Sequence, residues 1–231
     1  MIKNSSKEVL STVKLKVWDL PVRLFHWLLV ALLVGLWWTS QDVMTMNWHM
    51  YLGYALLALL LFRVLWGIFG SRSARFTDFV RGPISVFRYV KGLFSGEHRI
   101  HLGHNPLGGW SVIALMAALT FQGISGLFAN DQIFNRGPFA RSVSSSTSDL
   151  VTTLHKSNFD LILILVGIHI AAILFYRFVK RDDLVKPMIT GRKAVPANAD
   201  LKEVVFAQLW LAALLASVSA GVVWAVITYL P

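Results

Sequence analysis

Five long runs of apolar residues divide this chain. They cover roughly residues 21–40, 47–70, 106–129, 154–178 and 203–229. Each run holds about 20–27 residues, which is enough for a helix to cross the hydrocarbon core of a bilayer with some tilt. The pattern predicts an all-α integral membrane protein in which a bundle of helices crosses the membrane five times.

Two of the connecting stretches have patterns of their own. Residues 76–94 read FTDFVRGPISVFRYVKGLF, a mixture of apolar and basic side chains that Gly82 and Pro83 interrupt. We expect an interfacial segment on the cytoplasmic surface, with an ordinary solvated loop as the alternative. Residues 142–148 read SVSSSTS, which predicts a flexible polar loop on the outer side.

Composition supports a membrane protein and removes several kinds of chemistry. Hydrophobic residues make up 55% of the chain and charged residues 15%, whereas soluble domains have roughly a quarter charged residues. The chain has no cysteine, which excludes disulfides, iron–sulfur clusters, thiolate zinc sites and a cysteine nucleophile. Its seven histidines are the remaining side chains best suited to bind a metal.

The formal net charge of +10 comes from residues that lie between the apolar runs. Lysine and arginine gather before the first run and in the connections 71–105 and 179–202. The connection 41–48 has none, and 130–153 has Arg136 and Arg141. The positive-inside rule therefore predicts an N-terminus on the cytoplasmic side and a C-terminus on the outer side, which would be the periplasm in a bacterial inner membrane such as the resemblance below implies. This distribution explains the charge without a nucleic-acid partner.

Histidines recur at two depths of the predicted bundle. His155 and His169 are 14 residues apart in the fourth run, so they share one helix face and lie about 21 Å apart along the axis. His49 opens the second run at the level of His155, and His26 lies in the first run toward the level of His169. We therefore expect two pairs, His49 with His155 on the outer side and His26 with His169 on the inner side.

Each pair could bind a haem iron from both faces, with the macrocycle lying inside the bundle. A bare zinc or copper ion would be bound less well, because each depth offers only two obvious protein ligands. Ionisable side chains inside membranes also serve as proton relays, so a relay or transporter remains open at this point.

Three further residues could contact the inner group. Arg63 follows His49 by 14 residues and should face the same interior, where haem propionates would suit its guanidinium; the alternative is that it snorkels to the surface. Arg23 is a second candidate, or simply a positive-inside charge. His104 could contact an inner haem or replace His26 as a ligand, whereas we expect His98 and His101 to be solvated.

Three motifs resemble the bacterial cytochrome b-561 family, which is related to the cytochrome b subunits of nickel–iron hydrogenases. They read KVWDLPVRLFHW at 16–27, GHNPLGGW at 103–110 and HKSNFDLILILVGIHIAAILFYR at 155–177. The resemblance covers roughly residues 14–193. It implies a four-helix bundle that holds two b-type haems and exchanges electrons between quinone or quinol and a redox partner. The implied ligands are His26, His49, His155 and His169.

The resemblance divides the chain into two parts. Residues 14–193 would form the di-haem four-helix membrane domain, and residues 194–231 would add one C-terminal transmembrane helix. That helix has no histidine, and its small residues would allow close packing on the core or on a second copy of the chain. These residues are Ala216, Ser217, Ser219, Ala220 and Gly221.

The function that follows is electron transfer in a bacterial inner membrane. We expect a multi-pass cytochrome, in contact with lipid, that links the quinone pool to a periplasmic c-type cytochrome or another redox subunit. Trp110 and Gln122 are candidate linings of a quinone site. One alternative is an enzyme, a superoxide:quinone oxidoreductase whose outer haem attracts the anion through Lys156 and Arg141. Another is a haem-free transporter or scaffold.

Overall fold

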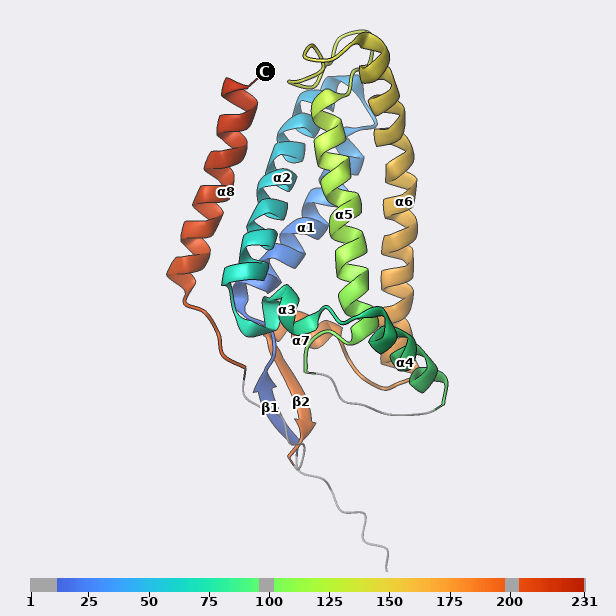
Figure 1. The fold of residues 1–231 in the computed structure, drawn as a ribbon, viewed down its shortest axis with the longest axis vertical. Helices are drawn as coiled ribbons and strands as arrows, with labels where there is room; N and C mark the ends of the chain where they lie inside the picture. The colour runs from blue at the N-terminus through green and yellow to red at the C-terminus, as the bar shows by residue number, and fades with distance from the viewer. Residues whose placement is uncertain (1–11, 96–101, 198–203, 231) are drawn as a thin grey trace, which may run out of the picture.

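Five long helices run side by side in the computed structural model (Figure 1), which describes residues 12–95, 102–197 and 204–230. They are α1 (Leu20–Thr39), α2 (Met46–Phe69), α5 (Pro106–Phe128), α6 (Ser145–Phe178) and α8 (Leu209–Tyr229). Each is long and apolar enough to cross a membrane. The predicted all-α membrane bundle is therefore confirmed. His98 and His101 lie outside the described residues.

Two helices begin at different residues from those that hydropathy predicts. Helix α6 begins at Ser145, because the Ser144 hydroxyl accepts a hydrogen bond from the backbone N–H of Thr147 at 3.2 Å and caps the helix. The prediction of a loop over 142–148 is therefore wrong for its second half. Helix α8 begins later than predicted. The residues before it are held instead by Ser71, whose hydroxyl accepts from the Ala207 N–H at 2.9 Å.

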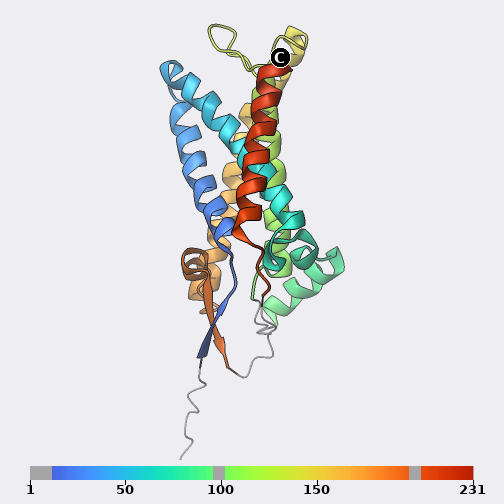
Figure 2. The same ribbon diagram turned by 90° about the vertical axis from the view of Figure 1, so that its left-hand side faces the viewer.

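Two hydrophobic clusters hold the bundle together. One joins α2, α5 and α6 near mid-height, through Leu56, Leu60, Ala118, Leu119 and Ile162. The other joins α1, α2 and α8 nearer one end, through Val22, Phe25, Phe62, Trp66, Ala74 and Ala212. Helix α8 therefore packs on the outside of α2, as Figure 2 shows. Its opposite face is exposed and apolar, which suits contact with lipid.

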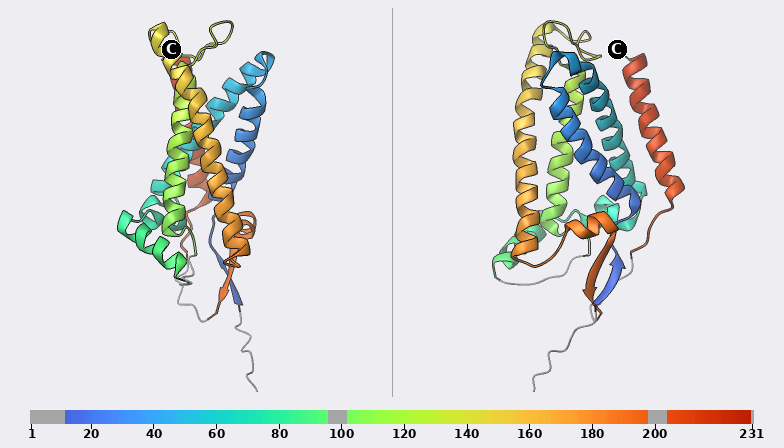
Figure 3. Two further views of the ribbon diagram at one scale, coloured as in Figure 1. Left: turned by 90° about the vertical axis from the view of Figure 1, so that its right-hand side faces the viewer. Right: turned by 180° about the vertical axis from the view of Figure 1, so that it is seen from behind.

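The short elements gather at one end of the bundle, which we call the basic end (Figure 3). They include the 3₁₀ turn Arg72–Ala74, α3 (Phe76–Phe79), α4 (Pro83–Phe94) and α7 (Val185–Thr190). The predicted interfacial segment is thus helical, and α4 lies beside the start of α5 and projects to one side of the bundle. The opposite end carries the 3₁₀ turn Val43–Thr45 and the α5–α6 connection.

A two-stranded sheet at the basic end was not expected from the sequence. Strand β1 (Thr12–Lys16) pairs antiparallel with β2 (Arg192–Pro196), with Lys14 opposite Ala194. Gly191 precedes β2 with a left-handed φ of 78°, and a Cβ there would lie 2.8 Å from the Trp18 carbonyl oxygen. The predicted boundary between residues 193 and 194 falls inside β2.

Asp19 joins the start of α1 to the end of α2. Its Oδ1 caps α1 by accepting from the Val22 N–H at 2.8 Å, and its Oδ2 accepts from Trp66 Nε1 at 3.0 Å. Both Asp19 and Trp66 are buried. Since a buried carboxylate is stable only when its oxygens are hydrogen-bonded, these two bonds fix the level at which α1 and α2 meet.

Candidate haem-binding sites

His49 and His155 meet inside the bundle, far from the basic end. His49 lies in the first turn of α2, and His155 lies in the third turn of α6. Their ring centres are 6.4 Å apart, with an angle of 82° between the rings. Two imidazoles that bind one metal ion from opposite faces, each at about 2 Å, have ring centres roughly 6 Å apart. The spacing therefore suits a single metal between them.

Backbone carbonyls orient both imidazoles. His49 Nδ1 lies 2.9 Å from the Leu36 oxygen, and His155 Nδ1 lies 3.0 Å from the Gln122 oxygen. A carbonyl oxygen can only accept, so each Nδ1 carries the proton and donates. Each Nε2 therefore carries the lone pair through which histidines usually bind a metal; the Gln122 amide, which lies within hydrogen-bonding distance of His155 Nε2, would have to give way to a metal there.

Polar side chains of α5 and α6 form a network around His155. The Gln122 amide nitrogen lies 3.2 Å from His155 Nε2, and Asn158 donates to Gln122 Oε1 at 2.7 Å. The Ser125 hydroxyl lies 3.0 Å from His155 Nδ1. From the sequence, Gln122 was expected only to line a quinone site, and no role was expected for Ser125 or Asn158. Ser125 follows Gln122 by three residues, and Asn158 follows His155 by three. A polar side chain at such a position in an apolar span is the feature of the sequence that could have identified them.

A cavity of about 450 Å³ opens beside this histidine pair, between α1, α2, α5 and α6. Gly53 lines it four residues after His49, and a Cβ on Gly53 would meet no atom within 4 Å. A Cβ on Gly126 would lie 3.1 Å from His155 Cε1. The two glycines therefore leave room for a flat group where side chains would otherwise fill the bundle.

The second predicted pair lies nearer the basic end. His26 is in the second turn of α1 and His169 is in α6, nine residues before Phe178. His104 lies just before α5, with its ring between those of Trp18 at 4.7 Å and Phe79 at 4.6 Å. Within the described residues, the buried Nδ1 atoms of His26 and His104 have no hydrogen-bond partner. Such atoms could bind polar groups of a cofactor.

Arg63 is buried beside this second pair, with 2% of its surface exposed. Its guanidinium donates to the Ala74 oxygen at 3.2 Å and lies 5.0 Å from the ring centre of Phe76. Burial, and then the charges of Arg63, His169 and His26, lower the pKa of His104 to about 3. Four basic side chains thus converge here. Arg63 does not snorkel to the surface, and its buried charge could pair with a carboxylate of a cofactor.

Arg23, the other predicted arginine, has different contacts. Its guanidinium donates to the Asp19 carbonyl oxygen at 3.4 Å and to the Ile189 oxygen at 2.6 Å. These bonds join α1 to α7 at the surface of the basic end. A role for Arg23 at a cofactor stays a prediction.

Similarity to a protein family identifies the cofactor of this chain. The family model of prokaryotic cytochrome b561 matches residues 17–191, which is most of the chain. The chain belongs to the prokaryotic cytochrome b561 family. Neither a curated protein nor a solved structure matches it. The cytochrome is therefore a multi-pass bacterial membrane protein that binds haem b and transfers electrons. The haem-free alternative is wrong.

The histidine pairs of the cytochrome suit haem chemistry. The haem macrocycle itself supplies four nitrogen ligands to iron, so the protein needs to add two axial ones. Each predicted pair offers two imidazoles. Within residues 12–95, 102–197 and 204–230, no group of three or more histidine, aspartate or glutamate side chains could hold a bare metal ion. The open space at Gly53 and the carbonyl-anchored rings of His49 and His155 fit a haem.

Substitution of Gly53 tests whether the cavity holds a haem. Gly53→Leu should reduce the haem-to-protein ratio of the purified cytochrome, because the leucine side chain would occupy the space beside His49. The helix itself should tolerate the change, since leucine exceeds glycine in helix propensity by roughly 0.8–1 kcal/mol.

The matched control is Gly221→Leu. A Cβ on Gly221 in α8 also meets no atom within 4 Å, but this helix lies outside the cavity. Haem content should be unchanged there. Full haem content in Gly53→Leu would mean that the cavity is not a haem site.

Proposed function

We propose that this cytochrome holds two haem b groups in each chain, one between His49 and His155 and one between His26 and His169. It would carry electrons between the quinone pool and a periplasmic redox partner such as a c-type cytochrome. The observation that carries the proposal is the His49–His155 pair, with ring centres 6.4 Å apart and both Nδ1 atoms near backbone carbonyls. The 14-residue spacing of His155 and His169 then sets the second level about 21 Å away.

The chain's own residues would position and insulate the cofactors. The bound haems supply one-electron carriers. Leu36 and Gln122 orient the imidazoles through their carbonyls, and the cluster that includes Leu56 and Leu119 excludes water at mid-height. Arg63 would pair with propionates, and its positive charge would favour the reduced iron.

Charge distribution supports a direction for the bundle. Lys14, Lys16, Arg72, Arg75 and further basic residues lie at the basic end, whereas the α5–α6 connection at the opposite end has Arg136 and Arg141. By the positive-inside rule, the basic end would be cytoplasmic. The His49–His155 site would then face the periplasm, and the His26–His169 site the cytoplasm.

Histidine substitution tests the two-haem assignment. His49→Ala or His155→Ala should remove one haem, and His26→Ala or His169→Ala should remove the other, because each iron would lose an axial ligand. The purified cytochrome should then contain half the haem of the unsubstituted protein, as measured by absorbance after extraction.

The double variants sharpen this test. His49→Ala/His155→Ala should retain the same haem content as either single variant, whereas His49→Ala/His26→Ala should lose nearly all haem. Unchanged haem content in both single variants of one pair would refute that pair. Replacement of His104 by alanine should leave two haems unless it, rather than His26, is the ligand.

Arg63 should tune the potential of the haem at the His26–His169 site. A unit charge acting over about 10 Å at an effective dielectric constant of about 20 contributes about 1.7 kcal/mol, or roughly 70 mV. We therefore expect Arg63→Leu to lower one midpoint potential by tens of millivolts in a redox titration. Arg63→Lys should cause a smaller shift, because it keeps the charge but loses the planar fork. Equal potentials in Arg63→Leu and the unsubstituted protein would contradict this role.

A second function, oxidation of superoxide at the outer haem, has one supporting observation. Lys156 and Arg136 line the cavity beside His155 and would attract a small anion; Arg141, expected to act with Lys156, is not among the lining residues. If superoxide is a substrate, Lys156→Gln should slow haem reduction by superoxide in stopped-flow measurements and leave reduction by a quinol unchanged. Reduction by quinol alone would leave electron transfer to a protein partner as the function.

A further inference from the structure

A second cavity, of about 480 Å³, lies at the basic end, on the side of α4. It is formed where α4, the start of α5, the end of α6 and β2 come together. Its charged lining residues come from segments that are far apart in the sequence. They are Asp78, Arg81, Arg88, Lys180, Arg181, Asp182 and Lys193.

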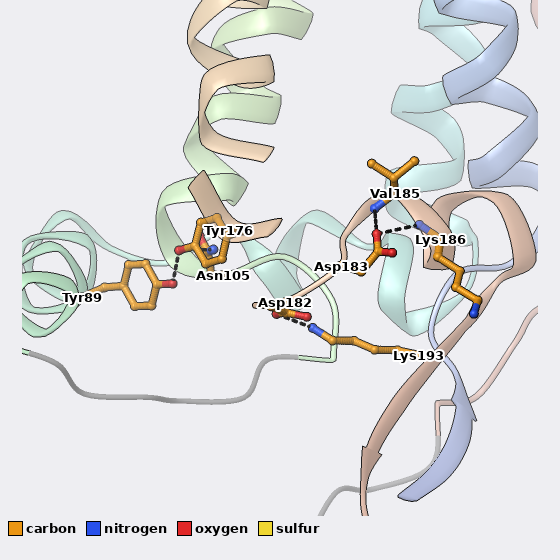
Figure 4. A network of polar contacts seen from close by, with 8 residues as sticks. All are labelled: Tyr89, Asn105, Tyr176, Asp182, Asp183, Val185, Lys186 and Lys193. Atoms are coloured by element: carbon orange, nitrogen blue, oxygen red, sulfur yellow. Dashed lines mark hydrogen bonds and ion pairs between the residues drawn. The ribbon is translucent and has the colours of Figure 1, made fainter. Parts of the chain in front are cut away.

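Cationic groups outnumber acidic ones in this cavity. Lys193 is buried and forms an ion pair of 2.8 Å with Asp182, as Figure 4 shows, so these two charges largely compensate each other. The remaining lining charges are four cationic side chains and the carboxylate of Asp78. Such an excess of positive charge in a concave site favours an anionic ligand.

The backbone conformation of Arg181 and two hydrogen bonds hold the end of α6 beside this cavity. Arg181 has a left-handed φ of 55°, which is uncommon for a residue with a Cβ and is maintained only when neighbouring contacts impose it. Here the Asp182 N–H donates to the Tyr176 carbonyl oxygen at 3.0 Å, and Lys180 Nζ donates to the Leu93 oxygen at 3.1 Å. The first bond fixes the turn that ends α6, and the second holds it against α4.

Neutral donors complete the lining. The lining residues Tyr89 and Tyr176 have hydroxyl groups that are hydrogen-bonded to each other, and Asn105, which lies outside the lining, donates its Nδ2 to the Tyr176 hydroxyl at 3.0 Å (Figure 4). Burial and the bond to Tyr176 raise the pKa of Tyr89, so its hydroxyl stays protonated. Phosphate oxygens accept both from cations and from such hydroxyl groups.

Exposed large apolar side chains neighbour the lining residues in the sequence, on α4 and at the end of α6. Ile84 and Phe87, one turn apart on α4, are 73% and 74% exposed, and Phe178 at the end of α6 is 71% exposed. Water is a poor environment for so many large apolar side chains. Acyl chains would cover them while a charged headgroup entered the cavity.

We propose that this cavity binds the phosphate group of an anionic membrane lipid. Basic pockets between membrane helices commonly recognise such headgroups. A neutral quinone ring offers no charge to four cationic side chains, and a soluble phosphate would leave Ile84 and Phe87 uncovered. His104 lines this cavity and also lies near His26 and His169, so the cavity adjoins the proposed inner haem site and its ligand is tested in the haem-loaded protein.

Lipid binding to the purified, haem-loaded cytochrome tests the proposal. The delipidated protein in detergent would be titrated with phosphatidylglycerol, phosphatidylcholine, glycerol 3-phosphate or inorganic phosphate, with bound lipid counted by native mass spectrometry and stability followed by thermal unfolding. We expect phosphatidylglycerol to bind and to raise the unfolding temperature. The other three compounds should have little effect.

Charge-removing variants locate the site. Arg88→Gln/Arg181→Gln should weaken phosphatidylglycerol binding at least about tenfold, since charge-assisted hydrogen bonds are roughly twice as strong as neutral ones. The matched control is Arg72→Gln/Arg192→Gln, which removes two exposed charges from the same end outside the cavity. If the first double variant loses haem or unfolds, Arg88→Gln alone replaces it.

Each outcome has a defined meaning. Equal binding to both double variants would overturn the proposal, as would equal binding of phosphatidylcholine. Equal stabilisation by inorganic phosphate, lost in the Arg88/Arg181 variant, would support a phosphate site and overturn the lipid as its source. Displacement of phosphatidylglycerol by a quinone analogue at equal concentration would assign the cavity to quinone and overturn the proposal.

Discussion

Polar side chains inside a bilayer must bind other groups of the protein or of a cofactor, because no water is available there. This constraint organises the cytochrome. His49 and His155 meet it through the carbonyls of Leu36 and Gln122, which lie on α1 and α5. The same bonds bring four helices around one cavity. Any change that removed these partners would affect helix packing as well as the ligand geometry.

The buried polar residues near the basic end satisfy this constraint differently. Arg63 is surrounded by aromatic rings and donates to one backbone oxygen, and its charge lies near the imidazoles of His26, His104 and His169. Within the described residues, Asp19 is the carboxylate whose charge acts on Arg63, and no hydrogen bond joins the two. A propionate of a haem would balance the buried charge of Arg63, so cofactor binding and the stability of this end should be linked.

The basic end is more elaborate than a set of loops. The pairing of β1 with β2 connects the segment before α1 to the segment after α6, and α4 packs beside the start of α5 and bonds to the end of α6 through Tyr89 and the Leu93 oxygen. Arg23 and Asp19 add bonds between α1 and its neighbours. These contacts link α1, α2, α5 and α6, the helices within the family match, at the basic end. Helix α8 packs separately against α2 through Ala212.

Sequence alone determined the five spans, because hydropathy and length act locally, and it placed His155 and His169 on one face, because the helical period is fixed. The motifs also indicated the family that the match over residues 17–191 establishes. Tertiary structure decided the rest: the open space at Gly53, the burial of Arg63, the position of α8 and the β1–β2 pair. Each depends on contacts between residues far apart in the chain, and local periodicity carries no information about which distant side chains or backbone carbonyls will come within bonding distance.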